Sequence, residues 1–240
     1  MNNTFDFKRF GQVLAKDWKN YFRNFGISLI VWSCIPVLFW IATLIFDTNM
    51  EAAGRIALIA SLVFSVLIFV PSKVYGKANL SRDGVSFAIL PATNAEKFFS
   101  MVIYCSILTP IFVGLGSWAV DTLLALLPFG GFTGFVMLPK SHLGMQLLTI
   151  ACSILLISSI FVFGNLFFKK RKTGKTIAWT MLIVFVIAML FQIFNVWNLL
   201  DTWFASLSTN TNLWVNIGIC LVFAIVFYFL TYRKIKNQKY

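Results

Sequence analysis

The chain has 240 residues, of which 59% are hydrophobic and 12% are charged, and its formal net charge at pH 7 is +12. So few charged side chains cannot cover the surface of a water-soluble globule, which excludes an ordinary soluble domain. The apolar residues gather instead into six runs, most of them near the length of about 20 residues with which a helix crosses a bilayer.

Before the first run, residues 1–26 predict an amphipathic elbow helix that lies in the cytoplasmic surface of the membrane. The aromatic residues of this segment recur at spacings of three and four and gather on one face, away from the cations. The residues expected to contact the membrane surface and its anionic headgroups are Lys16, Trp18, Lys19 and Arg23. The alternative is a helix packed on a soluble domain, but the sequence contains no such domain for it to cover.

The six runs predict an all-α integral membrane protein with six transmembrane helices over residues 27–232. They lack the strict alternation over about 10 residues that strands of a membrane barrel require. The expected spans are about 27–46, 56–71, 98–127, 145–168, 177–194 and 213–232. The third run is longer than a span needs and holds Asp121 near its far end, so its ends are expected to protrude from the hydrocarbon.

The distribution of Lys and Arg predicts that both termini are cytoplasmic. Eighteen of the twenty basic residues lie in the N-terminal segment, the loops after the second and fourth runs, and the tail of residues 233–240. Only Arg55 and Lys140 fall in the other loops, and positive charge is retained on the cytoplasmic side. Because the cations form short clusters beside spans, nucleic-acid binding is not expected.

The cytoplasmic loop between the second and third spans contains a signal for the start of a helix. Pro91 disfavours a helical conformation at Leu90, and Thr93 stands three residues before Glu96, the spacing of a capping box. One interpretation is a cap that only stabilises the start of the third span. The other is a surface that presents Phe87, Leu90 and the residues that follow to a partner.

A segment after the fifth span, residues 195–212, predicts a short amphipathic helix at the outer membrane interface, where Trp is enriched. The residues expected to form it include Trp197, Asp201, Trp203 and Phe204. It serves either as a gate or as an anchor.

The sequence contains no set of residues for catalysis or for binding a metal or cofactor. Its eight acidic residues are too scattered for a carboxylate pair or a metal site, so the chain is not expected to be an enzyme. The stretch RKTGKT, residues 171–176, has the end of a nucleotide-binding loop but lacks the first glycine. An ion-coupled carrier is disfavoured because, apart from Asp121, no span contains a charge.

Taken together, the basic amphipathic start, the six spans with both ends inside, the stretch LPATNAEKF and the outer amphipathic segment resemble an ABC transporter permease of the type-2 exporter class (ABC-2 type) from bacteria. The stretch LPATNAEKF is similar to the segment that begins the third span in permeases of that class. The resemblance extends over nearly the whole chain and is mostly one of topology.

The resemblance implies that the loop between spans two and three docks into a separate ABC ATPase subunit. The implied docking residues are Phe87, Leu90, Pro91, Thr93, Asn94, Glu96 and Lys97. ATP and Mg would then bind the partner subunit, and no cofactor would bind this chain.

The resemblance further implies a dimer with a second permease copy or a paralogue, in the bacterial inner membrane as a multi-pass protein in contact with lipid. The cargo would be amphiphilic, lipid-like, a peptide or an antibiotic. The alternative function is a membrane scaffold or immunity protein that binds a peptide or partner without transporting it.

Overall fold

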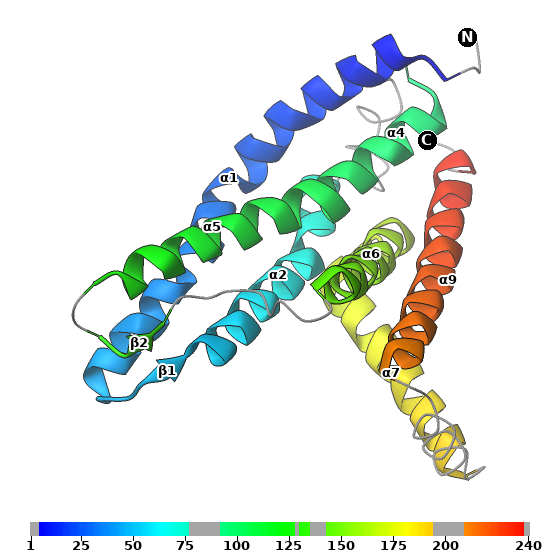
Figure 1. The fold of residues 1–240 in the computed structure, drawn as a ribbon. Helices are drawn as coiled ribbons and strands as arrows, with labels where there is room; N and C mark the ends of the chain where they lie inside the picture. The colour runs from blue at the N-terminus through cyan, green and yellow to red at the C-terminus, as the bar shows by residue number, and fades with distance from the viewer. Residues whose placement is uncertain (1–4, 77–91, 128–129, 135–142, 194–208, 238–240) are drawn as a thin grey trace.

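The structure is a computed structural model, and it describes residues 5–76, 92–127, 130–134, 143–193 and 209–237. Nearly all of this part of the chain is helical (Figure 1). The helices are α1 (Phe7–Ile45), α2 (Ala52–Val74), α4 (Asn94–Val102), α5 (Thr109–Ala125), α6 (Leu143–Phe167), α7 (Lys172–Ile193) and α9 (Thr209–Lys236), and the π-helical segment η1 (Ile103–Leu108) joins α4 to α5. Two short strands, β1 (Met50–Glu51) and β2 (Phe132–Thr133), pair in parallel.

Six helical stretches of the described chain are long and apolar enough to cross a membrane, as the sequence predicted. Five of them agree with the expected spans to within about five residues at each end. The third is the continuous stretch of α4, η1 and α5, which covers 32 residues. At about 1.5 Å per residue its length exceeds the hydrocarbon thickness of about 30 Å.

The first helix differs from the prediction of a separate elbow helix over residues 1–26. α1 runs for 39 residues without a break near residue 26, and Pro36 lies inside it. It starts where the Asp6 side chain accepts a hydrogen bond from the backbone N–H of Lys8 at 2.9 Å, a common form of N-cap. The expected domain boundary is therefore not a boundary between helices.

Part of the aromatic face of this first helix packs on protein, whereas Phe7, Trp18 and Phe22 are exposed, so its contact with the membrane surface remains a prediction. Tyr21 and Phe25 are fully buried, and the Tyr21 ring lies 5.4 Å from that of Tyr104. The side chains predicted to contact the membrane surface, Lys16, Trp18, Lys19 and Arg23, are all exposed. The extended start of the third span supplies the packing surface that the sequence did not reveal.

α1 and the α4–α5 stretch lie side by side along most of their length, and α2 packs against both (Figure 1). α6 packs on α2, and α9 runs along α6. The core of buried apolar side chains lies where these helices meet. Its members include Tyr21, Phe25 and Leu29 of α1, Leu62, Val66 and Val70 of α2, Met101 and Tyr104 near the π-helical segment, and Val162 and Leu166 of α6.

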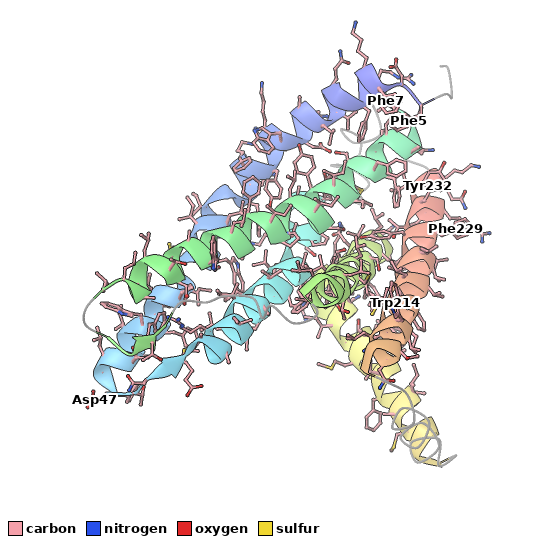
Figure 2. The ribbon with its side chains drawn as sticks, viewed as in Figure 1. Phe5, Phe7, Asp47, Trp214, Phe229 and Tyr232 are labelled. Atoms are coloured by element: carbon pink, nitrogen blue, oxygen red, sulfur yellow. The ribbon has the colours of Figure 1, made fainter. Side chains whose placement is uncertain are left out.

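One end of the bundle, here called the basic end, comprises the starts of α1, α4 and α7 and the ends of α2, α6 and α9. Figure 2 shows Phe5 and Tyr232 at this end and Asp47 at the opposite end. The last turn of α9 contains Arg233, Lys234 and Lys236, where cations interact favourably with the helix dipole. In the described part of the chain, the basic residues near the ends of α2, α6 and α9 thus lie at this end.

Pro110 explains why a π-helical segment interrupts the third span. Proline has no N–H, and in a regular α-helix its ring clashes with the carbonyl four residues earlier. Here the backbone N–H of Thr109 bonds to the carbonyl of Tyr104, five residues back, which widens the helix locally. The Thr109 hydroxyl donates to the same carbonyl at 2.6 Å.

Candidate functional site

The predicted capping box at the start of α4 is present. The Thr93 hydroxyl oxygen accepts a hydrogen bond from the backbone N–H of Glu96 at 3.3 Å. In return, Glu96 Oε2 accepts from the backbone N–H of Thr93 at 2.8 Å. The two residues satisfy amides that the first turn of a helix otherwise leaves free.

Glu96 also ties the start of α4 to the start of α1. Its second carboxylate oxygen, Oε1, accepts from the backbone N–H of Asp6 at 2.9 Å and from Arg9 Nη2 at 3.1 Å. The Glu96 side chain is completely buried, and a carboxylate is stable in such a place only when its oxygens are paired. Asp6, Arg9, Thr93 and Glu96 are called the Glu96 junction below.

A second polar cluster lies two turns further along α1. Asp17 Oδ2 accepts hydrogen bonds from the Ser100 hydroxyl at 2.5 Å and from the Tyr75 hydroxyl at 3.1 Å. Tyr104 donates to the backbone carbonyl of Leu14 at 2.7 Å. These bonds connect α1 to the end of α2 and to the α4–η1 stretch.

The end of α2 is in turn bonded to α6 and α7. Asn165 Nδ2 donates to the carbonyl of Tyr75 at 3.2 Å, and Lys172 Nζ donates to the carbonyl of Gly76. The Thr173 hydroxyl donates to that of Ser72 at 2.8 Å. A continuous set of polar contacts therefore crosses the basic end from α1 to α7.

The predicted docking residues fall into three groups. Phe87, Leu90 and Pro91 lie outside the described residues. Asn94 is exposed and Thr93 is partly buried. Glu96 and Lys97 are buried in the structure, where Glu96 bonds to the start of α1, and their contact with a partner stays a prediction.

Residues 195–208 of the predicted outer interfacial segment lie outside the described residues, and residues 209–212 form the start of α9. All four named residues of this segment, Trp197, Asp201, Trp203 and Phe204, fall within 195–208.

At the opposite end of the bundle, the structure pairs two charged residues that sequence reasoning left unpaired. Arg55 Nε, near the start of α2, lies 3.8 Å from Asp121 Oδ1, near the end of α5, and both side chains are at most 3% exposed. Arg55 Nη2 donates to the backbone carbonyls of Thr133 and Gly134, and the guanidinium lies 4.8 Å from the centroid of the Phe132 ring. The sequence shows one charge beside the second apolar run and one within the third. It does not show which residues of two different spans lie at the same height, so the pairing could not be predicted.

Three hydroxyl groups meet inside the bundle where η1, α6 and α9 converge. Ser106 Oγ and Tyr228 Oη are 2.6 Å apart, and Ser158 Oγ lies 2.7 Å from Ser106 Oγ and 2.8 Å from Tyr228 Oη. Each residue comes from a different helical segment. Hydroxyl pairs of this kind hold membrane helices together where apolar packing against lipid provides no preference.

Within the described part of the chain, no group of three or more His, Cys, Asp or Glu side chains is placed to hold a metal ion. The polar clusters described above are contacts between helices. Comparison of the chain with protein-family models, curated proteins and solved structures finds no match.

Proposed function

We propose that this chain is the transmembrane permease subunit of an ATP-driven exporter of the ABC-2 type, powered by a separate ATPase subunit. The proposal combines the resemblance of LPATNAEKF to the start of the third span in such permeases with the six membrane-length helices. The ATPase would dock on the segment between α2 and α4, bind ATP and Mg itself, and supply the energy for transport.

The observation that carries this proposal is the Glu96 junction. A force applied to the segment just before Thr93 would act on α4, and Glu96 would pass it to α1 through Asp6 and Arg9. The Asp17 cluster would extend the displacement to the end of α2. Such contacts suit this role because buried charges resist separation from their partners.

The burial of Glu96 and Lys97 changes their proposed role from the one the resemblance implied. Glu96 holds α1 in place through Asp6 and Arg9, while Asn94 and the segment before Thr93 supply the contacts with the ATPase. The remaining features of the proposal are a cytoplasmic position for the basic end, a bacterial inner-membrane location, and a dimer with a second copy or a paralogue. The cargo is proposed to be amphiphilic.

The proposal is tested by purifying the full chain from its native membrane after photo-crosslinking. A benzophenone amino acid replaces Asn94, and the same amino acid at Asn24, an equally exposed asparagine in the middle of α1, serves as the control. The expected result is an Asn94-dependent adduct with a chain that contains a complete nucleotide-binding loop and hydrolyses ATP.

An adduct at both positions, or with a chain that lacks such a loop, contradicts the proposal. If the crosslinked chain is a small peptide or a non-hydrolysing protein, the scaffold or immunity function takes its place.

A further inference from the structure

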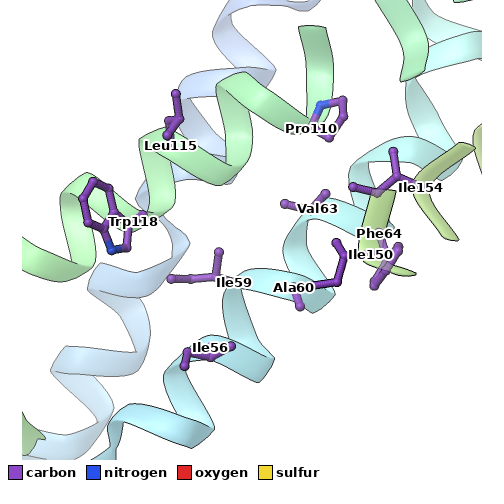
Figure 3. A pocket seen from close by; sticks show the side chains of 10 residues that line it. All are labelled: Ile56, Ile59, Ala60, Val63, Phe64, Pro110, Leu115, Trp118, Ile150 and Ile154. Carbon is purple, nitrogen blue, oxygen red and sulfur yellow. The ribbon is translucent and has the colours of Figure 1, made fainter. Parts of the chain in front are cut away.

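A groove with a volume of about 570 Å³ lies between α2, α5 and α6 (Figure 3). Every side chain that lines it is aliphatic or aromatic, apart from the indole nitrogen of one Trp. The lining residues are Ile56, Ile59, Ala60, Val63, Phe64, Pro110, Leu115, Trp118, Ile150 and Ile154. Such a surface offers a ligand apolar contact and almost no hydrogen bonds.

The groove opens on the outside of the bundle, within helices of membrane-spanning length. Leu115, Trp118 and Ile150 line it and are 60%, 48% and 43% exposed, respectively. The helices that contribute them each meet the length and hydropathy of a span. The groove is therefore open to the hydrocarbon interior of a bilayer.

The alternatives to a lipid in this groove are water, a void or another protein segment. Water requires two or more polar partners, which the lining does not provide. A void leaves the lining atoms without dispersion contacts on one side. Lipid hydrocarbon is the component that surrounds the groove and matches its chemistry.

The volume of the groove fits a single small ligand. At about 570 Å³ it lies within the range of about 300–1,000 Å³ that is typical of sites for such ligands. A helix of a second copy would cover the groove from outside by inserting side chains, and the test below distinguishes that arrangement from a lipid.

We propose that this groove is a binding site for one acyl chain of a bilayer phospholipid. The proposal depends on the membrane location of the chain and not on transport. Since lipid tails are as apolar as the lining, selectivity comes from the fit of a single flexible chain to the recess. The lipid bound there should exchange more slowly than lipids on the flat outer faces of α7 and α9.

The test uses the full chain in nanodiscs of phosphatidylcholine, with p-benzoyl-phenylalanine in place of Leu115 at the mouth of the groove. Leu123 is the matched control position, because it lies on the same helix, is 65% exposed and does not line the groove. After irradiation, intact-mass measurement is expected to give one phosphatidylcholine adduct at position 115, in higher yield than at position 123.

A second pair of variants separates groove binding from general contact with lipid. Ala60→Trp fills the groove, and Ala57→Trp adds the same ring to an exposed position of α2 outside it. In the presence of the probe at position 115, Ala60→Trp is expected to lower the lipid adduct about tenfold, which corresponds to about 1.4 kcal/mol of binding free energy. Ala57→Trp is expected to leave it unchanged.

Three results would overturn the proposal. The first is equal lipid labelling from positions 115 and 123, and the second is an adduct yield that Ala60→Trp does not lower. The third is a covalent dimer of the chain formed from position 115, which would show that a second copy covers the groove.

Discussion

The carboxylate of Glu96 lies 3.1 Å from Arg9 Nη2, across 87 residues of sequence. The Arg9 side chain is 26% exposed, whereas that of Glu96 is completely buried. Arg9 therefore lies on the solvent side of the contact between α1 and α4. The same carboxylate caps the helix that it joins to α1. A residue that the sequence marks as a simple helix cap is therefore also a joint between two spans.

Glu96→Gln is expected to lower the free energy of unfolding by about 1–3 kcal/mol, because hydrogen bonds to a buried charged group are lost or weakened. The measurement is denaturant or thermal unfolding in one detergent. Glu51→Gln is the control, since Glu51 is exposed and makes no side-chain cap bond at the start of α2. Equal losses of stability from the two substitutions would contradict the claim that Glu96 stabilises the contact between α1 and α4.

Arg55 and Asp121 are expected to behave as a coupled pair. Arg55→Met or Asp121→Leu alone leaves a buried charge without its partner and is expected to cost about 3–5 kcal/mol. The double variant is expected to cost less than the sum of the two, by about 0.5–3 kcal/mol. A double-mutant cycle on unfolding free energies measures this difference, and strictly additive costs would show that the two charges act independently.

Tyr228→Phe is expected to destabilise the bundle by about 0.5–1.5 kcal/mol, because Ser106 and Ser158 lose a hydroxyl partner while the ring contact with Phe98 is kept. Tyr232→Phe provides the matched control, since this ring also packs on Phe98. Thermal unfolding of both variants checks the expectation. An equal or larger loss from Tyr232→Phe would show that the Tyr228 hydroxyl makes no specific contribution through Ser106 and Ser158.

Gly116→Ala is expected to push α1 and α5 apart, because a Cβ atom at this position would lie 2.5 Å from Ser33 Oγ and 2.9 Å from Ser33 Cβ. Overpacking of this kind costs about 1–3 kcal/mol. Gly218→Ala is the control within a helix: nothing lies within 4 Å of the new Cβ, so this change is expected to stabilise by about 0.5–1 kcal/mol. If the melting temperatures of the two variants shift in the same direction, α1 and α5 do not approach each other closely at Gly116.

The features that sequence could predict are those encoded locally. Runs of apolar residues locate the spans, and the spacing of Thr93 and Glu96 encodes a capping box that the structure confirms. Pro110 was a local signal for a disturbed helix, and it was missed because proline is tolerated in membrane helices in several ways.

The features that sequence could not predict depend on register between distant segments. Nothing near Arg55 in the chain indicates that Asp121 lies beside it, and nothing near Glu96 indicates that Arg9 covers it. The burial of Tyr21, in the aromatic stripe of α1, against Tyr104 could not be predicted for the same reason. An amphipathic pattern shows which face is buried, but it does not say whether protein or lipid covers that face.

The most direct test of the account is the side of the membrane on which Asn94 lies, because an ATPase can act on the start of α4 only from the cytoplasm. Asn94→Cys and Asp47→Cys, at opposite ends of the bundle, are labelled with a membrane-impermeant maleimide in intact cells and in inverted vesicles, with the unsubstituted chain as the blank. The account predicts that position 94 reacts only in inverted vesicles and position 47 only in intact cells. Labelling of position 94 from outside the cell would contradict it.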